Sequence, residues 1–232
     1  MHRGYRHLFF DLDNTLWDFT TNSKLALQDV YNHYNLQRYY SDFKDYFEQF
    51  ELNNTTLWRL YGTEKITKDV LSVERFLAPL RPFGILNSRL ASDMSRLYLD
   101  ACSAKTTLMP HTLDVLDYLK PRYAMHIISN GFSEVQYKKL ELSGLSGYFS
   151  TVFLSEEVGC HKPKAGFFAF MLAKTAAQKE ESLVVGDNYE TDIEGAMNCG
   201  LDQVFYSPTA ECKPEQHATY IIADLLELCG FL

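Results

Sequence analysis

The sequence has 232 residues, of which 46% are hydrophobic and 14% are aromatic. This is enough apolar material to build a packed core in one large domain or two smaller ones, so the composition excludes a disordered chain. The formal net charge of −8 at pH 7 argues against binding of duplex nucleic acid, which requires a basic surface.

The cysteines and the first residues bear on the cellular compartment. The apolar run before Asp11 is too short for a signal peptide, and no window of the sequence is apolar enough for a membrane span. The cysteines are odd in number and form no C-x-x-C pair, which predicts neither a disulfide framework nor a zinc site. They are Cys102, Cys160, Cys199, Cys212 and Cys229. We therefore expect a cytoplasmic protein without membrane or nucleic-acid partners.

The first predicted strand is the aromatic-rich run at 8–10, which is typical of a strand buried on both faces of a parallel sheet. From about residue 23 to residue 99, apolar residues recur at helical spacing, which predicts four or five amphipathic helices. After residue 107, strand and helix patterns alternate. Strands are predicted at 125–129, 151–155, 182–187 and 203–207, and helices at 113–120, 133–142, 166–176 and 192–200.

This alternation predicts an α/β fold with a doubly wound parallel sheet. The helical block interrupts it after the first strand and is expected to form an inserted, all-helical cap domain. The expected core domain comprises residues 1–17 and 105–232, and the expected cap comprises residues 18–104.

Three predicted strands end at polar residues. Asp11 and Asp13 follow the first strand, Ser129 and Asn130 follow the second, and Asp187 follows the strand at 182–187. In an open α/β sheet, ligands bind beyond the carboxyl ends of the strands. These side chains should therefore converge if the three strands are neighbours.

Each of these signals also has a simpler explanation. A helix N-cap accounts for Ser129 and Asn130, and the helix dipole favours an acid such as Asp192 in a first turn. An exposed lysine is usually only solvated surface. Lys162, however, precedes a proline, which holds it in an extended conformation that can aim it inward.

A shared site would explain the acids better than separate caps. Asp11, Asp13 and Asp187 would repel one another unless a cation lay among them, and oxygen ligands of this kind suit Mg²⁺. Lys162 and Ser129 could then hold the oxygens of a phosphoryl group. The sequence thus predicts a phosphoryl-transfer site.

Four segments in this order resemble the motifs of the haloacid dehalogenase superfamily. They are DLDNTL at 11–16, ISN at 128–130, HKP at 161–163 and GDNYETD at 186–192. The resemblance covers nearly the whole chain and is strongest over 5–18 and 123–200. Asn14 stands where the superfamily most often has glycine, and asparagine is among the better substitutes in such a turn.

The resemblance implies specific chemical roles. Asp11 would be the nucleophile that forms an aspartyl-phosphate, and Asp13 would protonate the leaving oxygen and then activate water. Lys162 would assist catalysis. A dehalogenase would not need Asp13 in this role, so the second aspartate favours a phosphatase.

The resemblance also implies the binding groups. Mg²⁺ would be held by Asp11, Asp13 and Asp187, with the backbone carbonyl of Asp13 as a ligand, and Asp192 would support the metal site from behind. The expected phosphate-binding residues are Ser129, Asn130 and Lys162.

Segments 42–67 and 128–163 look like the bacterial pyrimidine-nucleotide 5′-nucleotidases. This implies a phosphoric monoester hydrolase acting on nucleoside 5′-monophosphates with a pyrimidine preference, as a monomer or homodimer. A sugar-phosphate phosphatase and a β-phosphoglucomutase-like phosphomutase remain alternatives. Some aromatic and apolar cap residues could stack on a base, but their helical spacing favours burial in the cap's own core: Phe47, Phe50, Leu57, Trp58 and Tyr61.

Overall fold

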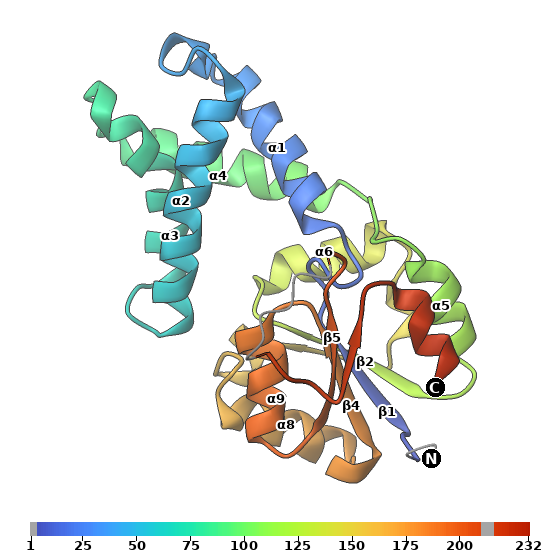
Figure 1. Ribbon diagram of the computed structural model, residues 1–232. Helices are drawn as coiled ribbons and strands as arrows, with labels where there is room; N and C mark the ends of the chain where they lie inside the picture. Colours follow the sequence, from blue (N-terminus) through green and yellow to red (C-terminus); the bar gives the residue numbers. More distant parts are fainter. Residues whose placement is uncertain (1–3, 210–215) are drawn as a thin grey trace. The chain divides into compact units, whose positions relative to one another are not determined.

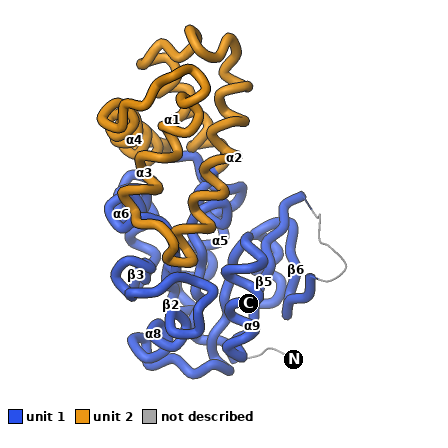
Figure 2. The backbone as a smooth tube through the Cα atoms, turned by 90° about the vertical axis from the view of Figure 1, so that its left-hand side faces the viewer, with its two compact units in different colours: residues 1–19, 106–232 blue, residues 20–105 orange. Residues whose placement is uncertain are grey.

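The structure of the protein is a computed structural model that describes residues 4–209 and 216–232 (Figure 1). The chain divides into two compact units, residues 1–19 with 106–232 and residues 20–105, coloured separately in Figure 2. The first boundary thus falls after Phe19 rather than after residue 17, and the second after Lys105 rather than after residue 104. One expected feature, Cys212, lies outside the described residues.

The first unit contains the α/β fold expected from the sequence. Its six strands form one sheet in the order β3-β2-β1-β4-β5-β6, and each neighbouring pair is parallel. The strands are β1 His7–Phe10, β2 Ala124–Ser129, β3 Thr151–Leu154, β4 Ser182–Gly186, β5 Asp202–Tyr206 and β6 Tyr220–Ile222. The short β6 carries no clear strand pattern and was not predicted.

Helices cover both faces of this sheet. Figure 1 shows α8 (Ala165–Thr175) and α9 (Gly195–Asn198) on one face and α5 (Thr112–Leu119) on the other. The other α-helices described in the unit are α6 Ser133–Leu142 and α7 Ser155–Val158, and a π-helix at Tyr189–Glu194 leads into α9. Phe9 of β1 packs in one buried cluster with Phe167 and Phe168 of α8, because strand residues alternate between the faces. The strands are therefore rigid supports for whatever follows their carboxyl ends.

The second unit is all-helical. It contains α1 Phe19–His33, α2 Phe43–Gly62, α3 Lys68–Leu77 and α4 Ser88–Ser103, with short 3₁₀ turns between them. Asp42, Thr67 and Asn87 cap the N-termini of α2, α3 and α4 by accepting a backbone N–H. In the described part of the chain, no helix combines the length and the apolar character that a bilayer span requires.

Of the five α2 residues that were expected mostly to fill the core of the cap, Phe50 is buried and the other four are half-buried. The buried side chains of α2 are Tyr46, Phe50 and Asn54, which lie four residues apart on one stripe. Trp58 and Tyr61 are half-buried and contact each other edge to face at 5.7 Å between ring centroids. The helical spacing predicted an apolar face, but the packed stripe is narrower than that face.

His126 of β2 is a core histidine with 3% of its surface exposed. Its ring lies 4.8 Å from that of Phe9, and its Nε2 lies 3.2 Å from Nδ1 of His7. Burial, together with the nearby His7, lowers the pKa of His126 from 6.5 to about 4. The imidazole is therefore neutral in the folded protein at pH 7.

This histidine should make folding sensitive to acid. Because the unfolded chain binds the proton more readily, the stability is fully present above the unfolded pKa of about 6.5 and is lost as pH falls towards 4. The loss is up to about 3 kcal/mol. We expect His126→Phe to reduce the loss of unfolding free energy over this range, measured by urea denaturation, and the exposed His33→Gln to leave it unchanged. Equal pH dependence in wild type and His126→Phe would contradict this.

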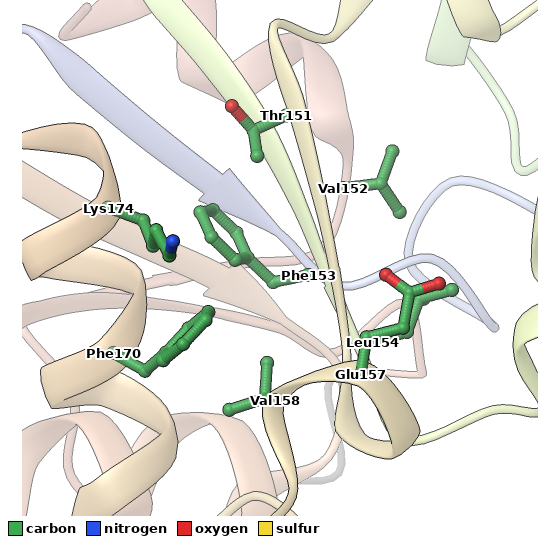
Figure 3. A pocket seen from close by; sticks show the side chains of 8 residues that line it. All are labelled: Thr151, Val152, Phe153, Leu154, Glu157, Val158, Phe170 and Lys174. Atoms are coloured by element: carbon green, nitrogen blue, oxygen red, sulfur yellow. The ribbon is translucent and has the colours of Figure 1, made fainter.

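A cavity of about 260 Å³ lies beside the edge strand β3. Figure 3 shows Phe153 of β3 and Phe170 and Lys174 of α8 around it. Its lining residues are mainly apolar and include none of the predicted site residues. It lacks the converging acids and donors that phosphoryl transfer requires, whereas such groups do lie at the ends of the central strands.

Candidate active site

The central strands bring the predicted residues together. β1 lies between β2 and β4, with Phe10 in register with Ile127 and Val185. Asp11, Ser129 and Asp187 therefore lie at the same edge of the sheet, although they are far apart in the sequence. The condition that the sequence left open, whether these three strands are neighbours, is met.

Lys162 places a buried positive charge among the acids at this edge of the sheet. Its ammonium Nζ is buried and donates to Asp11 Oδ1 at 2.7 Å, to Asp192 Oδ1 at 2.6 Å and to the carbonyl of Ile128 at 3.0 Å. A lysine ammonium has three donors, and all three are used here. Lys162 therefore fixes the position of the Asp11 carboxylate and partly neutralises it.

The acids influence one another strongly. Burial raises the pKa of Asp11 well above its usual range, Lys162 opposes this, and Asp192 and Asp187 add to it. Burial also raises the pKa of Asp187 to about 7, with Asp192 adding to the rise and a hydrogen bond from Thr15 opposing it. For Lys162, burial acts to lower the pKa, but Asp11 and Asp192 outweigh it and raise the pKa.

Three of these carboxylates can hold a divalent metal ion. One oxygen each of Asp11, Asp187 and Asp192 lie within 4.8 Å of one another. The raised pKa values of Asp11 and Asp187 indicate that this group needs more positive charge than Lys162 supplies. Buried or half-buried oxygen donors of this kind fit a hard cation. This group includes Asp192, which was expected to support the metal site, and does not include the Asp13 side chain.

Asp13 is instead held by residues that the sequence analysis missed. Its Oδ1 accepts from Nζ of Lys139 at 2.6 Å, and its Oδ2 accepts from Nε2 of Gln136 at 2.9 Å. Both donors lie in α6, three residues apart and so on one face of the helix. Asn14, beside Asp13, adopts the left-handed φ of 61°, so the turn forms without glycine, as expected.

Ser129 and Asn130 have different surroundings. The Ser129 hydroxyl oxygen accepts from Gln136 Nε2 at 2.6 Å and from the Gly131 N–H at 3.1 Å. Its own proton remains as a donor towards the site. Asn130 pairs through Nδ2 and Oδ1 with the backbone C=O and N–H of Lys162, each at 2.9 Å. Asn130 thus holds the segment that carries Lys162.

Gly186 leaves the space that Asp192 occupies. A Cβ on Gly186 would lie 2.6 Å from both Cβ and Cγ of Asp192, whose side chain is fully buried. We expect Gly186→Ala to displace Asp192 from Lys162, to lower the unfolding free energy by about 1–3 kcal/mol and to weaken metal binding, measured by urea denaturation and calorimetry. The exposed Gly147, whose Cβ would meet nothing within 4 Å, provides the matched control Gly147→Ala. Equal effects of the two substitutions would contradict this account.

Comparison with protein families agrees with this geometry. The family model described as haloacid dehalogenase-like hydrolase matches residues 8–206, which include all of the active-site residues described in this subsection. The chain belongs to this family. The family membership predicted from the four motifs is thereby confirmed.

Similar proteins from bacteria match over almost the whole chain. The HAD-hydrolase YfnB of Bacillus subtilis is 32% identical over 99% of this chain and 96% of its own. The pyrimidine 5′-nucleotidase PynA of Streptococcus pneumoniae is 31% identical over 96% of this chain and 94% of its own. The pyrimidine 5′-nucleotidase YjjG of Escherichia coli is 31% identical over 95% of each chain. The predicted resemblance to bacterial pyrimidine nucleotidases is confirmed, and the chain is a phosphatase of its family.

A solved structure supports the fold. The crystal structure of Bacillus subtilis YfnB bound to magnesium superposes with a TM-score of 0.88, at 30% identity and over 97% of each chain. The α/β core with its helical insertion is thus a known arrangement in this family.

Proposed function

We propose that this protein is a Mg²⁺-dependent phosphatase that hydrolyses nucleoside 5′-monophosphates, with a preference for pyrimidines. The observation that carries the proposal is the placement of Asp11, fixed by Lys162, beside Asp13, which is held by its own donors. The similarity to PynA and YjjG supports the nucleotide substrate. We assign the attack on phosphorus to Asp11 and the proton transfers to Asp13, because the two carboxylates have different hydrogen-bond partners.

The first half-reaction transfers the phosphoryl group to the protein. Lys162 holds Oδ1 of Asp11, so Oδ2 attacks phosphorus while the bond from phosphorus to the 5′-oxygen breaks. The leaving oxygen takes the electron pair of that bond and receives the proton of Asp13. The products are an aspartyl-phosphate at Asp11, a free nucleoside and the Asp13 carboxylate.

The second half-reaction releases phosphate. The Asp13 carboxylate takes a proton from a water molecule, whose oxygen attacks phosphorus and displaces the Asp11 carboxylate. The Ser129 hydroxyl donates a hydrogen bond to a phosphoryl oxygen. Asn130 keeps Lys162 in place, and Asp192 accepts from the same Lys162 ammonium as Asp11.

Mg²⁺ would be held by Asp11 and Asp187, with Asp192 close behind them and the Asp13 backbone carbonyl as a further ligand. When bound, it supplies positive charge to the phosphoryl oxygens and to the crowded acids. Four carboxylates (Asp11, Asp13, Asp187 and Asp192) share this edge with the ammonium groups of Lys139 and Lys162, so a divalent cation would balance their formal charge.

The substrate assignment can be tested by phosphate release from a panel of nucleoside monophosphates and sugar phosphates. We expect kcat/KM for UMP, CMP or dTMP to exceed that for sugar phosphates by at least about tenfold. Phosphate release measured with the Asp11→Asn variant gives the background rate of the assay. Equal or higher values for sugar phosphates would reject the nucleotidase assignment, and transfer of phosphate to a sugar without release would indicate a phosphomutase.

A further inference from the structure

Lys139 occupies an unusual position for a lysine. It is 2% exposed, in the middle of α6, and its Nζ lies 4.3 Å from the ring centroid of Trp17 and 5.2 Å from that of Phe19. The same Nζ donates to Asp13 at 2.6 Å. Burying an ammonium group is costly unless a specific partner compensates for it, and here the partner is the proposed acid–base group.

The partners of Lys139 come from one turn of the chain. The N–H of Asn14 donates to the carbonyl of Trp17 at 2.7 Å, which closes the turn that carries Asp13. The indole of Trp17 and the carboxylate of Asp13 therefore approach the ammonium as one unit. A cation placed against an aromatic face and a carboxylate loses the freedom of its long side chain, so it is a defined anchor for Asp13.

Gln136 extends this anchor to the phosphate-binding serine. Its Nε2 donates both to Asp13 Oδ2 and to the Ser129 hydroxyl oxygen. A carboxylate only accepts hydrogen bonds, so the amide must present its nitrogen here. Gly131 allows this position, because a Cβ on Gly131 would lie 2.6 Å from Cδ of Gln136.

We propose that Lys139 and Gln136 are positioning residues that hold the Asp13 carboxyl group by both oxygens while it transfers its proton to the leaving group and becomes a carboxylate. As Asp13 gives up its proton to the departing oxygen, negative charge develops on its carboxylate. Lys139 and Gln136 already lie where that charge forms, so little reorganisation is needed. This inference rests on the proposed function, and it assigns the acid step to a three-residue unit.

Leaving groups of different quality test this inference. An alkyl oxygen, as in a nucleoside monophosphate, needs a proton to leave, whereas p-nitrophenolate is a stable anion and does not. The ratio kcat/KM includes only the steps up to departure of the leaving group, so it isolates the acid step from phosphoenzyme hydrolysis. We expect Lys139→Met to lower kcat/KM for the best alkyl substrate of the panel by about 100-fold, and that for p-nitrophenyl phosphate by less than about fivefold.

Retained hydrolysis of p-nitrophenyl phosphate also shows that the variant is folded. Lys138→Met, at the neighbouring position of α6, is the matched control and should leave the ratio of the two kcat/KM values unchanged. Gln136→Met should shift the same ratio in the same direction, with an added loss on both substrates through Ser129. If Lys139→Met does not fold, the ratio of the two kcat/KM values in Gln136→Met tests the inference in its place.

Parallel losses on both substrates, or no loss on either, would overturn the inference. A wild-type enzyme that prefers sugar phosphates would reject the nucleotidase proposal alone, because the alkyl-to-aryl ratio is still measurable with the preferred sugar phosphate. The two failures are therefore distinguishable.

Discussion

Asp11→Asn should abolish phosphate release from every monoester, lowering kcat by more than about 10⁴-fold. An amide cannot attack phosphorus as the carboxylate does, and none of the neighbouring acids can take over, since each of them is held elsewhere. Asp13 is bound to Lys139, Asp192 is bound to Lys162, and Asp187 accepts from Thr15. The measurement is phosphate release at saturating substrate.

The fold should tolerate this substitution. The amide oxygen that replaces a carboxylate oxygen of Asp11 can still accept from Lys162, and removal of one negative charge relieves the repulsion that raises the pKa of Asp11. We therefore expect a melting temperature no lower than that of the wild type. An inactive variant that is also unfolded would not support the catalytic role, and an active, folded variant would contradict it.

Lys162→Met should have the largest combined effect on stability and activity. The substitution leaves Asp11 and Asp192 buried without their counter-ion, which costs about 3–5 kcal/mol of unfolding free energy. It also frees the Asp11 carboxylate to rotate, so phosphate release should fall together with stability. Urea denaturation and a phosphate-release assay measure the two effects separately.

Two further variants separate the loss of the Lys162 ion pairs from the general effect of replacing a lysine in this segment. Lys164→Met changes an exposed lysine two residues further along the chain, at the N-cap of α8, and should alter neither property. Lys162→Met combined with Asp192→Asn removes one of the stranded charges, so it should regain part of the lost stability without regaining activity. An unfolding free energy in Lys162→Met equal to that of the wild type would contradict the stabilising role of the ion pairs that Lys162 forms with Asp11 and Asp192.

The fold could be predicted because its signals are local and repeated. Short apolar runs followed by polar residues marked β1, β2 and β4, and the alternation with helices indicated a parallel sheet. The order of the strands was not readable, since pairing between segments more than a hundred residues apart leaves no local pattern. The strand ends predicted that Asp11, Ser129 and Asp187 meet only if the three strands are neighbours, and the resemblance of four motifs supported that condition.

The connections within the site were less predictable. Lys139 and Gln136 were recognised only as part of a helix, because lysine and glutamine in a helix are usually solvent-exposed. The available signal for a role in the site was their spacing of three residues in the helix that follows Ser129. Lys162 was expected to face phosphate, but its three donors bind Asp11, Asp192 and a backbone carbonyl. Such distances depend on tertiary packing, which the sequence does not display.

The central claim is that Asp11 carries the phosphoryl group, and trapping that intermediate tests it most directly. Wild-type enzyme would be quenched with acid during turnover of a nucleoside monophosphate and then reduced with borohydride, which converts an aspartyl-phosphate to homoserine. Peptide mass spectrometry should find homoserine at position 11 and should not find it in Asp11→Asn. Homoserine at another aspartate, or none in an enzyme that is releasing phosphate, would contradict the account.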